Sequence, residues 1–159
     1  KTGMAITIDI GETTDIHPKN KQEVGRRLSA WALSTVYERA GVESSGPLPE
    51  KHEARGGEVI VTFSHAGGLT ARGGEPVGFE IAGADQKWQP ATARIDGASV
   101  IVSSPAVPQP VAVRHGWAND PKCNLFNAAG MPATPFRTDD WKLPVVEATK
   151  PVAPKRNRK

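Results

Sequence analysis

The spacing of apolar residues changes near residue 57, and this change limits the folds open to the chain. Between residues 20 and 41, apolar side chains recur every three or four positions, as on one face of a helix. Beyond residue 57 they recur at every second position, as on half-buried strands, in the sets Val59, Val61, Phe63 and Val77, Phe79, Ile81. Sixteen Gly and fourteen Pro among 159 residues supply the turns that many short strands need. We therefore expect a small α/β part followed by an antiparallel β part.

Residues 1–43 are predicted to be the end of an α/β domain. Residues 5–10 form a β-branched, nearly continuous apolar run, which is typical of a strand buried on both faces of a parallel sheet. Asn20 and Glu23 have the spacing of a capping box, and Gly41 is a plausible stop, which predicts a helix of about 20 residues. A parallel strand needs neighbours that the rest of the chain does not offer. The earlier part of this domain is expected to lie outside the chain.

The remainder is predicted to be a linker, a β domain and a tail. Residues 44–57 are polar with two prolines and are expected to be a linker, and residues 58–145 a small antiparallel β-sandwich of four to six strands. Asp96-Gly97 between two apolar runs predicts a β-hairpin with a type I′ turn. Residues 146–159 are expected to be a disordered basic tail.

Charge and composition exclude several classes of protein. The last ten residues hold five basic side chains and no acid; these five charges exceed the net charge of +3, so the rest of the chain is slightly acidic. A nucleic-acid partner is therefore not expected. No apolar run reaches membrane-spanning length, so no membrane partner is expected either. Cys123 is the single cysteine and the four histidines lack metal-ligand spacing, so neither a metal nor a cofactor is predicted.

The run Asp15-Ile16-His17-Pro18 carries the clearest chemical signal. Pro18 biases His17 toward an extended backbone, where residues i and i+2 point to the same side about 7 Å apart. The Asp15 carboxylate can therefore turn toward the His17 imidazole and hold it in the tautomer that a general base needs. The alternative is that both residues are solvated turn or cap residues at the helix start.

A series of motifs extends from residue 3 to about residue 141. In order they are GMA (3–5), IDIG (8–11), DIHPKNKQEVGRRL (15–28), GFEIAGAD (78–85), AVRHGW (112–117), NLFN (124–127) and PFRTD (135–139). This series resembles the sialate O-acetylesterase-like carbohydrate esterases, which are SGNH-type serine hydrolases. The resemblance implies that residues 1–43 are the last strand, catalytic loop and last helix of a flavodoxin-like three-layer domain. It also implies removal of acetyl groups from sugars by a Ser-His-Asp mechanism, in a secreted or periplasmic enzyme.

Within this resemblance His17 is the expected base and Asp15 its orienting acid. Many SGNH hydrolases place the acid three residues before the histidine, where this chain has Thr14. Asp15 matches the sialate-esterase branch, although Glu12 or a distant acid stays open as the orienter. None of the eight serines lies in a nucleophile motif. The nucleophile and oxyanion hole are therefore expected on an N-terminal fragment of the same polypeptide. We expect the polypeptide to be nicked, so that this fragment stays bound to the chain; the alternative is that the chain was expressed as a fragment alone.

Two further residues are candidates for binding the acetylated carbohydrate. Trp117 and Arg137 lie in segments that match the family and are expected near the seam between the domains; core packing is the alternative for Trp117. His65 and His115 are interpreted as structural residues. A non-catalytic carbohydrate-binding β-module with a linker helix is the alternative function. The sugar itself stays open among sialic acid, xylan and xyloglucan substituents.

Overall fold

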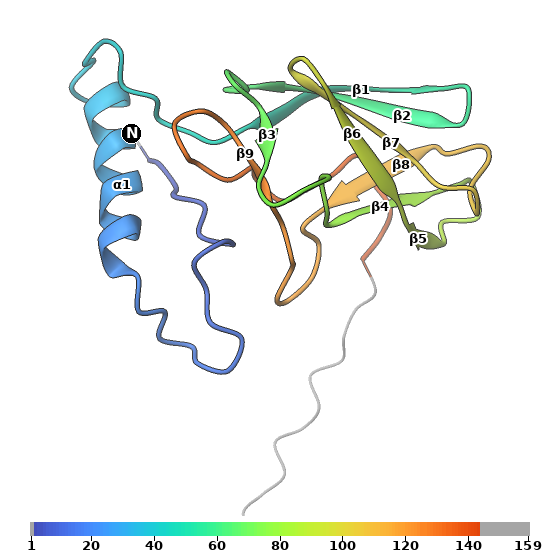
Figure 1. The fold of residues 1–159 in the computed structure, drawn as a ribbon, viewed down its shortest axis with the longest axis horizontal. Helices are drawn as coiled ribbons and strands as arrows, with labels where there is room; N and C mark the ends of the chain where they lie inside the picture. Colours follow the sequence, from blue (N-terminus) through green and yellow to red (C-terminus); the bar gives the residue numbers. More distant parts are fainter. Residues whose placement is uncertain (1, 144–159) are drawn as a thin grey trace, which may run out of the picture.

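The computed structural model describes residues 2–143, which form one helix and three small antiparallel sheets (Figure 1). Helix α1 spans Lys21–Thr35. The strands are β1 (Leu48–Arg55), β2 (Glu58–Ser64), β3 (Thr70–Ala71), β4 (Phe79–Ala82), β5 (Trp88–Pro90), β6 (Thr92–Asp96), β7 (Ser99–Ser103), β8 (Ala112–His115), β9 (Leu125–Phe126) and β10 (Phe136–Arg137). The basic tail predicted for residues 146–159 lies outside the described residues.

Two four-stranded sheets share one apolar core. The first has the strand order β1-β2-β7-β6 and the second β10-β8-β4-β5, while β3 and β9 form a separate pair. Alternate residues of β2 are buried, as the two-residue apolar period predicts. Phe63 of the first sheet meets Phe136 of the second edge-to-face, with 5.7 Å between ring centroids. This shared core confirms the antiparallel β part of the prediction, and the described chain as a whole is mostly β.

The hairpin between β6 and β7 is confirmed, but its turn type is not. Asp96 pairs with Ser99, so the two turn residues are Gly97 and Ala98 rather than Asp96 and Gly97. Only Gly97, at φ +59°, has a positive φ, whereas a type I′ turn requires two such residues. The predicted register was therefore one residue too early.

The expected linker over residues 44–57 is wrong for residues 48–55, which form β1. The pair Gly56-Gly57 joins β1 to β2, with φ values of +58° and +88° that a type I′ turn requires. The polar composition of β1 misled the prediction, because six of its eight residues are exposed. A strand at the edge of a sheet can be polar on both faces.

The strand predicted for residues 5–10 is not present. This segment is irregular and pairs with no other strand among residues 2–143, because these residues offer no parallel neighbour. No three-layer α/β arrangement is seen in the described part of the chain. Helix α1 is also shorter than predicted: it ends at Thr35, and Glu38 already has a left-handed φ of +53°, three residues before Gly41.

The start of α1 agrees with the sequence. The Asn20 side chain accepts a hydrogen bond from the backbone N–H of Glu23 at 3.1 Å, which caps the first turn. The Glu23 carboxylate does not return to Asn20, as a full capping box would require, and instead binds Arg26 and Arg27. No helix within residues 2–143 combines the length and the apolar character that crossing a membrane would demand.

Candidate catalytic pair and the adjoining hollow

A tight turn over residues 12–15 positions the candidate catalytic pair. Asp15 and Glu12 form an antiparallel bridge, in which the Asp15 backbone N–H donates to the Glu12 carbonyl at 3.3 Å. The Glu12 carboxylate is occupied elsewhere: it lies 3.1 Å from the Lys19 ammonium and accepts from the Lys19 backbone N–H at 3.3 Å. Of the two acids in this turn, the geometry therefore places Asp15 and not Glu12 against His17.

Asp15 holds both the backbone and the ring of His17. Its Oδ1 accepts a hydrogen bond from the His17 backbone N–H at 2.9 Å and lies 3.2 Å from the ring Nδ1. A contact of this kind favours the tautomer with the proton on Nδ1, which leaves Nε2 as a free proton acceptor. No side chain among residues 2–143 is hydrogen-bonded to Nε2, and the ring is 79% exposed. The structure thus contains the predicted Asp15–His17 contact, and its catalytic role stays a prediction.

A buried ion pair fixes the segment that leads into this turn. The guanidinium of Arg27 on α1 binds both carboxylate oxygens of Asp9 at 2.6 and 2.7 Å, and it donates to the carbonyl of Ile6 at 2.6 Å. The side chain of Arg27 is 5% exposed. On the same helix, hydrogen bonds from Arg26 and Arg27 lower the pKa of Glu23 to about 2 despite partial burial. These charges tie residues 6–9 to α1 without a strand.

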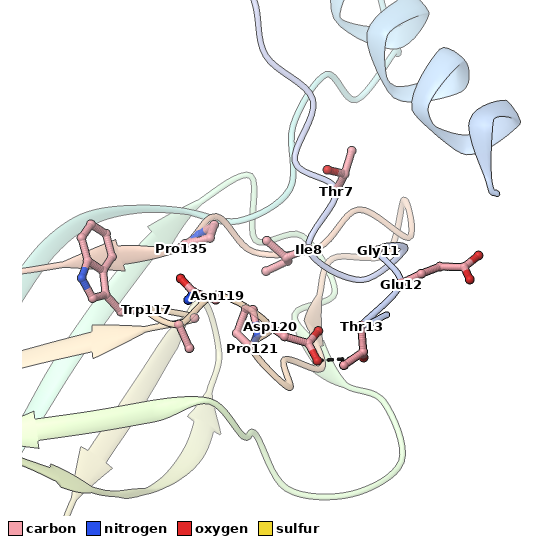
Figure 2. Close-up of a pocket in the computed structure, with 12 residues that line it drawn as sticks. Thr7, Ile8, Gly11, Glu12, Thr13, Trp117, Asn119, Asp120, Pro121 and Pro135 are labelled. Atoms are coloured by element: carbon pink, nitrogen blue, oxygen red, sulfur yellow. Dashed lines mark hydrogen bonds between the residues drawn. The ribbon is translucent and has the colours of Figure 1, made fainter. Parts of the chain in front are cut away.

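A hollow of about 700 Å³ lies beside the same turn (Figure 2). Two segments far apart in sequence form its walls: residues 7–13 and residues 116–121, with Pro135. The Thr13 hydroxyl donates to Asp120 Oδ2 at 2.8 Å across 107 positions of sequence. Among the hydrogen bonds of residues 2–143, it alone joins the His17 loop (residues 11–19) to the β part.

The two predicted substrate-binding residues differ in their placement. Trp117 lines the hollow and is 40% exposed. Arg137 does not line it; its guanidinium lies 5.5 Å from the centroid of the Trp117 ring and is held by the Asp139 carboxylate and, at 3.0 Å, by the Trp141 carbonyl. The structure therefore makes Arg137 a support for Trp117. Whether either residue touches a substrate stays a prediction.

Sequence reasoning did not single out the polar residues of the hollow. Thr13, Asn119 and Asp120 lie in loops, and the signal that points to them is the cluster of turn-forming residues 118–121 directly after Trp117. Their meeting with residues 7–13 is a tertiary contact that no local pattern encodes.

His65 and His115 do not line the hollow, whereas Cys123 lines a neighbouring hollow that shares Gly11, Thr13 and Asp120 with it. His115 is fully buried against Phe79, with ring centroids 4.3 Å apart. His65 Nδ1 lies 2.6 Å from a Glu43 carboxylate oxygen. Burial raises the pKa of the Cys123 thiol to about 11. Across residues 2–143, no three His, Cys, Asp or Glu side chains gather closely enough to hold a metal ion.

Comparison with known proteins gives this geometry a context. Sialate O-acetylesterase of Mus musculus is 27% identical to this chain over 149 residues, and the Homo sapiens protein is 27% identical over 150 residues. The chain is a distant homologue of the sialate O-acetylesterases. No family model matches it.

A solved structure is more similar than these esterases. A carbohydrate acetylesterase from Xanthomonas citri superimposes on this sialate O-acetylesterase homologue with a TM-score of 0.81 and 48% sequence identity, over 86% of this chain and 32% of that one. The chain likewise spans only 28% of the length of the curated sialate O-acetylesterases, at their C-terminal end. The predicted resemblance to carbohydrate esterases is therefore confirmed.

Proposed function

We propose that residues 1–159 form the C-terminal part of an SGNH-type carbohydrate O-acetylesterase. In this proposal residues 1–43 complete an α/β domain, and the nucleophilic serine and the oxyanion hole lie on a segment of the same polypeptide outside residues 1–159. The observation that carries the proposal is the doubly hydrogen-bonded pair Asp15–His17 in a chain homologous to carbohydrate acetylesterases.

His17 is the general base in the proposed reaction. As the serine Oγ attacks the acetyl carbonyl carbon, Nε2 of His17 removes the hydroxyl proton, and it then donates this proton to the sugar oxygen as the ester bond breaks. Water next attacks the acetyl-enzyme, and His17 takes its proton and returns it to the serine as acetate leaves. Asp15 keeps the ring oriented and stabilises its protonated form through Nδ1.

The exposed surfaces of the His17 loop and of α1 are consistent with a further protein segment that covers them. The ring is 79% exposed, and its neighbour Ile16 is 90% exposed, whereas a working base is normally shielded from bulk water. Leu28 on α1 and the following Tyr37 are also open to solvent. Only Arg27 and Ala30 of α1 are buried. An apolar surface of this kind marks an interface with another protein segment.

The proposal predicts that acetate release requires both His17 and the additional segment. The chain is combined with the segment that carries the serine, and acetate release from acetylated xylan or xyloglucan oligosaccharides and from O-acetylated sialic acid is measured. We expect the chain alone to be inactive, and His17→Ala to lower the rate on the order of 10³-fold or more in the combined enzyme. His52→Ala is the matched control, because His52 is exposed on β1 away from the hollow and should leave the rate unchanged.

The same assay separates this proposal from its alternative. If the His17→Ala enzyme keeps near-full activity, His17 is not the base and the proposed mechanism fails. If no combination releases acetate while the chain binds sugars, the protein is a carbohydrate-binding β-module. Secretion or a periplasmic location is part of the proposal and is tested by cell fractionation.

A further inference from the structure

The hollow between residues 7–13 and 116–121 is lined by polar groups with unused hydrogen-bonding capacity (Figure 2). The Asn119 side chain makes no hydrogen bond within residues 2–143, so its carbonyl and its NH2 group are both available to a ligand. Asp120 uses Oδ2 for Thr13, which leaves Oδ1 free to accept. An amide and a carboxylate next to each other suit neighbouring hydroxyl groups, each of which donates and accepts.

The hollow also has a prearranged aromatic wall. Trp117 lies at one end of the hollow, and Arg137 stacks on its ring at 5.5 Å from the centroid. Because Asp139 and the Trp141 carbonyl hold the guanidinium, the indole has little freedom to lose when a ligand binds. Aromatic surface with a few convergent polar groups is the usual composition of a small-ligand site. The C–H face of a sugar ring matches the indole and its hydroxyls match Asn119 and Asp120.

The charges of the lining select among sugars. Glu12 and Asp120 are the ionisable side chains that line the hollow, and both are acids. Lys19 neutralises Glu12, at the end of the hollow opposite Trp117 in Figure 2. Lys122 forms a salt bridge with Asp120 at 3.6 Å from outside the hollow. A sugar carboxylate would therefore meet an acid and no lining cation, which disfavours uronic and sialic acids.

We propose that this hollow is a subsite for an uncharged pyranoside chain, with Trp117, Asn119 and Asp120 as its binding residues. The inference rests on the proposed function and extends it, because the turn over residues 12–15 joins the hollow to the Asp15–His17 pair. In this proposal the β part binds those sugar units of the glycan that do not carry the reacting acetyl group. Uncharged oligosaccharides, rather than free acetylated monosaccharides, are the corresponding substrates.

Calorimetric titration of the 159-residue chain, alone and combined with the segment that carries the serine, tests this subsite. The probes are cellohexaose and xylohexaose as uncharged chains, and oligogalacturonate and oligosialic acid as charged ones. We expect at least one uncharged chain to bind and both charged chains to bind at least about tenfold more weakly. Trp117→Ala and Asn119→Ala should each weaken binding about tenfold, the scale of one lost aromatic or polar anchor. Asn119 is exposed and makes no protein hydrogen bond, so its variant keeps the test valid if Trp117→Ala fails to fold.

Two controls distinguish this inference from the proposed function. His52→Ala changes an exposed residue of β1 that lies outside the hollow, so binding should be unchanged. His17→Ala should keep full sugar binding, while in the combined enzyme it lowers acetate release on the order of 10³-fold or more. The subsite would be overturned if neither uncharged probe bound, or if a charged probe bound more tightly than the uncharged ones. It would also be overturned if Trp117→Ala and Asn119→Ala both bound sugar as tightly as the unchanged chain. None of these results would alter the acetate-release test of His17.

Discussion

Acidification is expected to destabilise the fold through one buried histidine. His115 is fully buried between the aromatic rings of Phe79 and Phe136, and neither ring nitrogen has a hydrogen-bond partner within residues 2–143. Burial lowers the pKa of His115 from 6.5 to about 4, and the nearby backbone of Gly78 offsets only part of this effect. In the folded chain His115 therefore stays neutral at pH values where it is protonated in the unfolded chain.

The sign and size of the effect follow from these two pKa values. Above pH 6.5 neither state binds the proton, so His115 adds no pH dependence. Between pH 6.5 and 4 only the unfolded state binds it, and stability falls by about 1.4 kcal/mol per pH unit. Below pH 4 both states are protonated, and the total loss levels off at about 3 kcal/mol. Glu23 also stabilises the fold less as the pH falls, because its pKa is lowered in the folded chain, but this loss occurs between about pH 4.5 and pH 2.

Urea unfolding at half-unit steps from pH 7.5 to 4.5 measures this loss. We expect the wild-type free energy of unfolding to fall by about 2 kcal/mol between pH 6.5 and 5. His115→Phe keeps an aromatic ring in the core but cannot bind a proton, so its profile should be flatter by that amount. Parallel profiles for the two proteins would refute the reasoning, because the pH dependence would then arise from other groups.

Two further perturbations test the contacts that shape the N-terminal part. Arg27→Met should leave the Asp9 carboxylate without its partner and release residues 5–11 from α1. We expect the free energy of unfolding, measured by thermal melts, to fall by about 3 kcal/mol and amide exchange in this segment to become faster. Unchanged exchange would contradict this expectation. Gly25→Ala and Gly46→Ala should have opposite effects. Gly25→Ala adds a methyl group at an open helix position and should raise the free energy of unfolding by about 1 kcal/mol. Gly46→Ala places its Cβ against the Pro132 carbonyl oxygen and should lower the free energy of unfolding. Equal melting temperatures for these two variants would contradict the packing around Gly46.

The β part was predictable because its strands have a clear period. Val59, Val61 and Phe63 recur at every second position, and the structure buries all three. The strand predicted for residues 5–10 failed for the opposite reason: an apolar run reports burial but not the neighbour that must supply the hydrogen bonds. β1 was missed because its exposed polar side chains carry no hydrophobic signal. The Gly56-Gly57 pair was the available local clue.

The candidate site was predictable only in part. The Asp15–His17 contact is local and the structure contains it, although residues 16 and 17 form a bend closed by the Asp15 carboxylate and not the extended chain that the sequence predicts. Glu12 could not be set aside from the sequence, because its bond to Lys19 depends on the shape of the turn. The hollow could not be predicted, because Thr13 and Asp120 meet only through the tertiary fold.

The bond between Thr13 and Asp120 also has a consequence for biosynthesis. The ribosome makes the chain from its amino end, so the histidine loop emerges more than a hundred residues before its anchor on the later sheets is synthesised. Until Asp120 has left the exit tunnel and its loop has folded, the loop has no hydrogen-bonded attachment to that half of the molecule. Attachment of the loop to the β part is thus a late event of maturation, and a chain terminated before Asp120 would carry the Asp15–His17 pair without it.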